Sequence, residues 1–144
     1  MEITVPAEMN VCDLLLDENV RRGRGGKVAV ISGEREVTYS ELVEMTSRLA
    51  NGLVELGLRP EERVLILLPD SVEFVVAYLG VMRLGAIAVP LNTLLKPQDY
   101  AYLLADSRAA AIIVHADYVA EVPCGSSSWL RYVVVVGNCS GGAG

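Results

Sequence analysis

Apolar positions along the chain follow two alternating patterns, one typical of helices and one typical of buried strands. Between residues 42 and 56, leucine and methionine recur at three- and four-residue spacing, which predicts an amphipathic helix. Thr38 and Glu41 stand just before this run with the spacing of a capping box, and Gly57 follows it as a left-handed terminating residue. We therefore expect a first large helix between Thr38 and Gly57.

Later segments repeat this alternation with different residues. Residues 63–68 are continuously apolar, as in strands that are buried on both faces, and residues 87–89, 111–114 and 132–136 predict further strands. Asp70 and Glu73 form a second cap-like pair before a helical run that carries Phe74, Tyr78, Val81 and Met82 on one face and ends at Gly85. Pro97, at a first helical position, predicts a helix to about Ser107.

These elements predict an α/β fold. Residues 28–32 and 36–38 are β-rich and flank Gly33-Glu34-Arg35, which indicates a hairpin ahead of the first helix. Strands that alternate with helices imply right-handed crossovers. We expect an open, mostly parallel sheet with helices on both faces, doubly wound or close to it.

Composition places this fold in a single domain. The chain has 144 residues, 52% of them hydrophobic and 21% charged, with 12 Lys+Arg against 18 Asp+Glu for a net charge of −6. That length suits one core, and the acidic balance disfavours nucleic acid or an anionic membrane as partner. Cys12, Cys124 and Cys139 are odd in number and lack a C-x-x-C pair, so we interpret them as buried or incidental thiols in a reducing compartment.

Membrane insertion and secretion are not predicted. The first ten residues lack a basic start followed by an apolar segment, so they do not form a secretory signal. The longest apolar stretch, residues 74–91, is interrupted by Arg83 and contains Gly80, Gly85 and Pro90, which favours helix, turn and strand over a membrane span. The expected location is the cytoplasm.

Few residues suggest chemistry. Residues 23–27 are rich in glycine and end in Lys27, but a phosphate-binding P-loop needs glycine where Arg21 stands and Ser or Thr where Val28 stands. The segment also precedes a strand, whereas a phosphate cradle joins a strand to a helix N-terminus. A solvated basic turn is the better interpretation, and the Ser/Gly-rich residues 123–128 and 138–144 are interpreted as a loop and a tail.

The single histidine and several aspartates stand at the ends of predicted elements. His115 follows an apolar strand, and without a second His or a suitably spaced Cys it does not predict a metal site. Acid–base chemistry is conceivable because strand carboxyl ends face the ligand crevice of such sheets, but a histidine that caps a loop is the simpler hypothesis. Capping likewise accounts for the carboxylates of Asp70, Asp99, Asp106 and Asp117.

Three blocks, in order and spacing, resemble the beginning of the adenylate-forming acyl- and aryl-CoA synthetases. They are residues 37–42 (Val-Thr-Tyr-Ser-Glu-Leu), residues 63–70 and residues 78–92, within a likeness that runs from about residue 9 to residue 137. Residues 92–108 are most similar to the benzoate–CoA ligase branch. The resemblance implies that residues 1–137 are a partial N-terminal domain of an AMP-dependent synthetase, followed by a flexible Gly/Ser tail at residues 138–144.

For a complete enzyme the resemblance implies two steps: ATP and a carboxylic acid give an acyl-adenylate, and the thiol of CoA then takes the acyl group. The motifs for ATP, Mg²⁺ and catalysis lie beyond residue 144 in the family pattern, so we expect no catalytic residue, no metal ligand and no bound cofactor in this chain, and no activity from it alone. Arg83 is the one candidate: in some aryl-CoA ligases a basic residue there approaches the phosphates of CoA. The alternative is an arginine that extends from the end of an apolar helix and complements its dipole.

Three hypotheses about the whole remain open. The chain is a fragment of an aryl-acid–CoA ligase, one part of a split ligase that docks on the remainder, or a free-standing α/β binding or scaffold module. Its expected partners are the carboxylic acid, ATP and CoA when the enzyme is complete, and the remainder of the ligase or a second copy otherwise. Self-association is expected through an unpaired sheet edge near Tyr132–Val136, which carries no Lys or Pro to discourage pairing.

Overall fold

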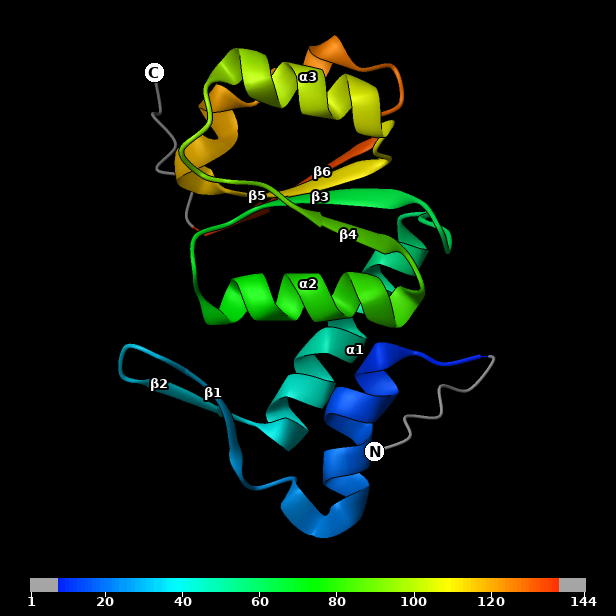
Figure 1. The fold of residues 1–144 in the computed structure, drawn as a ribbon, viewed down its shortest axis with the longest axis vertical. Coiled ribbons are helices and arrows are strands. Elements are labelled where there is room, and N and C mark those ends of the chain that lie inside the picture. Colours follow the sequence, from blue (N-terminus) through cyan, green and yellow to red (C-terminus); the bar gives the residue numbers. More distant parts are fainter. Residues whose placement is uncertain (1–7, 138–144) are drawn as a thin grey trace, which may run out of the picture.

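The computed structural model describes residues 8–137, which form a parallel sheet between helices and a small N-terminal layer (Figure 1). The strands are β1 (Val28–Ser32), β2 (Arg35–Thr38), β3 (Arg63–Leu67), β4 (Ile87–Pro90), β5 (Ala111–His115) and β6 (Tyr132–Val136). The α-helices are α1 (Tyr39–Glu55), α2 (Val72–Leu84) and α3 (Pro97–Ser107). Short helical turns complete the chain: η1 (Asp13–Asp17), η2 (Val20–Arg24), η3 (Ala116–Glu121) and η4 (Cys124–Ser126).

The main sheet has the strand order β4-β3-β5-β6, and all its pairs are parallel. Val64 of β3 aligns with Ala88 on one side and with Ala111 on the other, so β3 and β5 are the central strands. The chain passes from β3 to β4 at one edge and then returns across β3 to β5. The expected parallel sheet is therefore confirmed, and its strand order reverses direction as in a doubly wound fold.

Helices cover both faces of this sheet, as the sequence predicts. On one face α1 and α2 pack against Val64, Ile66 and Ile113, and on the other α3 packs against the alternate residues Leu65 and Ile112. Successive strand side chains point to opposite faces, so a strand that is covered on both sides must be apolar at every position. The continuous apolar runs of β3 and β5 have this cause.

A third cluster lies below α2, where the N-terminal turns and the β1–β2 hairpin pack against α1 and α2. Val72 and Leu79 of α2 contribute to it, while Ala77 and Val81 face the sheet. The single apolar face predicted for this helix is therefore an incomplete description, because α2 is buried on two sides. Within residues 8–137, no helix has the length and apolar character needed to cross a membrane.

The local signals at helix ends are mostly confirmed. The Thr38 hydroxyl accepts a hydrogen bond from the Glu41 N–H, and the Glu41 carboxylate accepts one from the Thr38 N–H at 2.8 Å, which completes the predicted capping box. Gly85 has a φ of 85°, as expected for a left-handed helix end. The prediction that Asp70 caps α2 is wrong: Ser71 is the capping residue, and its hydroxyl accepts from the Phe74 N–H at 3.1 Å.

Candidate functional site

The carboxyl ends of the strands line a crevice along one edge of the sheet. A hollow of about 490 Å³ lies where the segments that follow β3 and β4 approach the first turn of α2. In an open α/β sheet this is the edge where ligands bind. Its lining combines apolar side chains with one carboxylate, one amide and one hydroxyl: Leu68, Pro69, Asp70, Phe74, Pro90, Leu91, Asn92 and Thr93.

A second hollow of about 240 Å³ continues along this edge toward β5 and β6. It shares Pro69 with the first and adds polar groups of the α2 N-terminus and of the ends of β5 and β6: Ser71, Glu73, His115 and Gly137, beside Val136. The carboxyl ends of all strands of the main sheet therefore contribute to one side of the molecule.

Tyr100 holds the segment after β4 in place beside the larger hollow. Tyr100 belongs to α3, and its ring is buried. Its hydroxyl donates to the carbonyl of Asn92 at 2.9 Å. Burial raises the pKa of Tyr100, so the hydroxyl remains a donor at neutral pH. The Asn92 side chain in turn accepts from the Leu94 N–H at 2.9 Å. Nothing in the sequence indicates this positioning role of Tyr100, because its spacing indicates only a core-facing side of α3.

His115 caps the start of η3. Its Nδ1 accepts a hydrogen bond from the Asp117 N–H at 3.3 Å, and Asp117 Oδ2 lies at the same distance from that nitrogen. The imidazole also lies against Gly137, where an added Cβ would be 3.1 Å from Nε2. This geometry agrees with the interpretation of His115 as a loop-capping residue. Asp99 also caps as expected, since its carboxylate accepts from the Lys96 N–H at 3.0 Å. The side chains of Asp70 and Asp106 are exposed to solvent.

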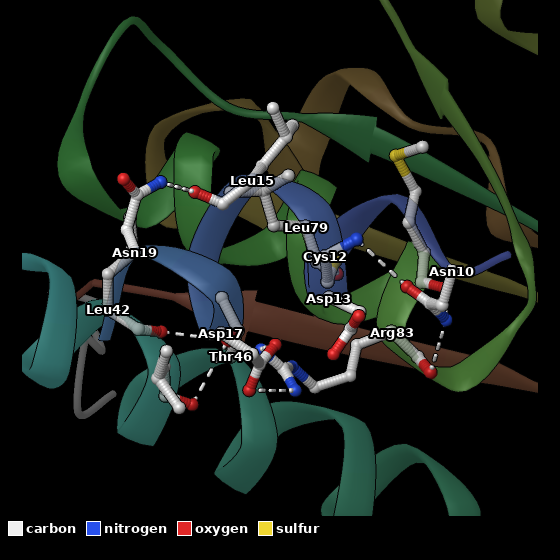
Figure 2. A network of polar contacts seen from close by, with 12 residues as sticks. Asn10, Cys12, Asp13, Leu15, Asp17, Asn19, Leu42, Thr46, Leu79 and Arg83 are labelled. Atoms are coloured by element: carbon white, nitrogen blue, oxygen red, sulfur yellow. Dashed lines mark hydrogen bonds and ion pairs between the residues drawn. The ribbon is translucent and has the colours of Figure 1, made fainter. Parts of the chain in front are cut away.

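Arg83 lies in a polar network between three helical elements, η1, α1 and α2 (Figure 2). Its guanidinium binds the Asp17 carboxylate through two nitrogens, Nη2 to Oδ2 at 2.8 Å and Nη1 to Oδ1 at 3.3 Å. Its Nε donates to the Thr46 hydroxyl at 3.2 Å. The two charged side chains are only 20% and 27% exposed, so this pair is largely removed from water.

The surroundings of Arg83 extend the network along the N-terminal segment. Thr46 is fully buried and donates its hydroxyl hydrogen to the Leu42 carbonyl at 2.7 Å. Asn10 donates to the carbonyls of Met82 and Arg83 at the end of α2, and Cys12 donates its thiol hydrogen to the Leu79 carbonyl at 3.0 Å. Burial raises the pKa of Cys12, which keeps that thiol protonated. These bonds attach residues 10–17 to α1 and α2.

Arg83 and the crevice lie at opposite ends of α2. The helix begins after β3 at the carboxyl edge of the sheet and ends before β4 at the amino edge, and its 13 residues span roughly 20 Å. The structure therefore does not bring the candidate Arg83 together with Asp70 or His115.

The glycine-rich residues 23–27 use their carbonyl groups to hold the start of α1. The Tyr39 N–H donates to the Lys27 carbonyl at 3.0 Å, and the Ser40 N–H donates to the Gly25 carbonyl at 2.9 Å. A phosphate cradle presents N–H groups at a helix N-terminus, and here those groups already have partners. No three His, Cys, Asp or Glu side chains of residues 8–137 are grouped as metal ligands. Residues 23–27 therefore do not form a phosphate cradle in this structure.

Comparison with known proteins gives the family. The model of a family described as AMP-binding enzyme matches residues 16–136. The 4-hydroxybenzoate–CoA/benzoate–CoA ligase of Rhodopseudomonas palustris is 36% identical over 125 residues, covering 85% of this chain and 23% of that enzyme. The benzoate–CoA ligase of Thauera aromatica is 34% identical over 139 residues, covering 94% of this chain and 26% of that enzyme. The chain thus spans about a quarter of the length of these relatives.

Solved structures agree with the sequence relatives. An anthranilate–CoA ligase in complex with anthranoyl-AMP superposes with a TM-score of 0.86 and 36% identity, over 92% of this chain and 26% of that one. A benzoate–CoA ligase from Burkholderia xenovorans superposes with a TM-score of 0.81 and 36% identity, over 90% of this chain and 26% of that one. The fold described above is thus the N-terminal subdomain found in CoA ligases.

Proposed function

Because the chain belongs to the AMP-binding enzyme family, we propose that it forms the N-terminal part of a CoA ligase that acts on aryl carboxylic acids of the benzoate and hydroxybenzoate class. The observation that carries this proposal is the sequence agreement with aryl-acid ligases over almost the whole chain. Relatives that act on long-chain fatty acids also match, at 36% identity but over only 59% of the chain. The longer sequence match to the aryl-acid enzymes favours an aryl substrate.

In the proposed enzyme, ATP and the acid form an acyl-adenylate with release of pyrophosphate. The thiol of CoA then attacks the acyl carbon and displaces AMP. We assign the ATP, Mg²⁺ and acid sites to the remainder of such an enzyme, because the motifs that serve them lie beyond residue 144 in the family pattern. This part supplies the sheet, the helices and the crevice edge against which that remainder packs, in an enzyme that we place in the cytoplasm.

Arg83 is the residue of this chain proposed to meet CoA. A guanidinium carries five N–H groups, and the contacts to Asp17 and Thr46 use one on each nitrogen, so one N–H on each Nη remains for a phosphate oxygen. Asp17 orients the guanidinium but also offsets its charge, which weakens the attraction to a phosphate. The positioning role within the network and the CoA contact are therefore compatible, and kinetics separate them.

A chimera tests the proposal. Residues 8–137 of this chain replace the matching N-terminal segment of the benzoate–CoA ligase of Thauera aromatica, and benzoyl-CoA formation is measured with benzoate, ATP and CoA. We expect the chimera to fold and to retain activity within about tenfold of the parent, because the transplanted part carries framework and no catalytic group. A chimera that fails to fold, or that folds without making benzoyl-CoA, contradicts the proposal.

The same two parts expressed as separate polypeptides test the split-ligase alternative. Benzoyl-CoA formation on mixing would show that this chain docks noncovalently and productively. Activity from the fused chimera only would favour a continuous polypeptide.

A further inference from the structure

Two neighbouring strands of the sheet lead the chain to opposite faces beside the larger hollow. Strand β3 continues into α2 on one face, and the adjacent strand β4 continues into α3 on the other (Figure 1). Where the connections of adjacent strands separate in this way, a crevice opens at their carboxyl ends, and open α/β sheets bind ligands there. The hollow of about 490 Å³ lies between these two connections. The crevice is therefore a product of the topology of the described strands and helices.

Tyr100 fixes the wall that residues 90–93 contribute to this crevice. The Leu91 N–H donates to the Ile66 carbonyl of β3 at 2.8 Å, and the chain then turns away from the sheet toward α3. The next residue, Asn92, is held through its carbonyl, which accepts from the Tyr100 hydroxyl at 2.9 Å. Tyr100 is only 1% exposed and packs among the core residues under α3, so its ring has a fixed position. Its hydroxyl transfers that position to the crevice wall.

The fixed wall presents hydrogen-bond donors opposite an aromatic ring. The Asn92 Oδ1 accepts from the Leu94 N–H at 2.9 Å, which orients the amide so that the Nδ2 hydrogens are the donors it can offer. Thr93 adds a hydroxyl on the same wall, and Phe74 and Asp70 lie on the other. The Asp70 carboxylate would repel a polyphosphate, whereas an aryl group with a polar substituent matches the apolar surface and the donors.

We propose that Tyr100 is a positioning residue for the aryl acid, and that through the Asn92 carbonyl it fixes a wall that borders the acid site of the complete enzyme. This inference rests on the proposed function, because the acid site is formed with the remainder of such an enzyme. Tyr100→Phe keeps the buried ring but removes the donor, so the Asn92 carbonyl loses its anchor and the wall can move. A small displacement beside a bound group weakens its binding without unfolding the protein.

The chimera with the benzoate–CoA ligase of Thauera aromatica provides the kinetic test. With Tyr100→Phe, KM for benzoate in pyrophosphate release should rise at least threefold, while KM for CoA in thioester formation stays unchanged. The matched control is Tyr118→Phe, the same change in a partly buried tyrosine of η3 that packs against the same core cluster. We expect this control to leave KM for benzoate within about 1.5-fold of the unsubstituted chimera.

Hydrogen exchange provides a second measurement on the 144-residue chain itself. Mass spectrometry should show that Tyr100→Phe accelerates exchange of the backbone amides of residues 91–96 at least fivefold and leaves those of β3 and β5 at the wild-type rate. Tyr118→Phe should leave residues 91–96 unchanged. Unchanged exchange in Tyr100→Phe would overturn the inference whatever the kinetics show, since the hydroxyl would then not hold the wall.

The kinetic outcomes separate this inference from the proposed function. A folded chimera without activity contradicts the proposed function and this inference with it. An active chimera in which Tyr100→Phe leaves KM for benzoate unchanged overturns the inference alone. Equal rises in KM for benzoate, ATP and CoA, with a lower melting temperature, would also overturn it, because Tyr100 would then act only through the stability of the fold.

Discussion

The Arg83 guanidinium and the Asp17 carboxylate form a two-point ion pair, with 2.8 Å between Nη2 and Oδ2, across 66 residues of sequence. The pair connects η1 to the last turn of α2, and a hydrogen bond from the Nε of Arg83 to the Thr46 hydroxyl connects the same turn to α1. One arginine thus connects three segments that meet only in the folded chain. The position that the family resemblance associates with CoA also stabilises the N-terminal layer.

Asp17→Asn should destabilise the chain by about 1–2 kcal/mol. It leaves a largely buried guanidinium without its counter-charge, and hydrogen bonds to charged groups contribute more than neutral ones. Urea unfolding followed by circular dichroism measures the change. The control is Asp13→Asn, which breaks an exposed pair with Arg21 and should cost less than about 0.5 kcal/mol. Equal effects of the two substitutions would contradict the role given to Asp17.

Arg83→Ala in the active chimera separates the two roles of Arg83. If the guanidinium contacts a CoA phosphate, KM for CoA rises while the rate of adenylate formation is nearly unchanged. If Arg83 acts only through Asp17 and Thr46, both half-reactions decline together and the melting temperature falls. Measuring pyrophosphate release without CoA, and thioester formation at varied CoA, distinguishes these results.

Gly80→Ala should destabilise the fold by about 1–3 kcal/mol, because a Cβ there would lie 2.8 Å from Leu49 Cδ2 where α2 crosses α1. Gly52→Ala is the control within α1. A Cβ at Gly52 meets nothing within 4 Å, so the higher helix propensity of alanine should stabilise the chain by about 0.5–1 kcal/mol. Thermal unfolding should therefore show shifts of opposite sign. Two shifts of the same sign would mean that α1 and α2 do not pack as described.

Acid should weaken the chain partly through Glu62. The side chain of Arg131 hydrogen-bonds the Glu62 carboxylate at 2.7 and 2.9 Å and lowers the pKa of Glu62. A carboxyl whose pKa is depressed in the folded state contributes stability above its ordinary pKa, and that contribution is lost as pH falls through the folded pKa. Glu62→Gln should therefore lower stability at pH 7 and flatten its decline below about pH 4.5. An unchanged pH dependence of urea midpoints would contradict this.

Much of the main sheet could be predicted because its signals are local. The capping box at Thr38, the left-handed Gly85 and the continuous apolar runs of β3 and β5 each reflect the physics of a few neighbouring residues. The spacing of Asp70 and Glu73 predicts Asp70 as the cap of α2, but the neighbouring Ser71 is an equally good capping residue, and one residue of register decides between them. Such a choice depends on the direction in which the chain leaves β3.

The N-terminal layer could not be predicted in the same way. Residues 13–17 and 20–24 form π-helical turns. In the first turn Leu14 and Leu15 are exposed and Leu16 is buried, so the usual helical spacing of apolar positions is lost. The ion pair of Asp17 with Arg83 depends on tertiary packing and leaves no local signal. The strand order and the hydrogen bond from Tyr100 to Asn92 likewise result from the crossover connections.

Pyrophosphate release tests the central claim most directly, measured in parallel on the 144-residue chain and on the chimera with ATP, Mg²⁺ and benzoate. The account predicts no benzoate-dependent release from the chain alone above a heat-inactivated control, and clear benzoate-dependent release from the chimera. Benzoate-dependent release by the chain alone would show that it holds an adenylation site of its own. A folded chimera without release would show that this chain cannot serve as the N-terminal part of an aryl-acid ligase.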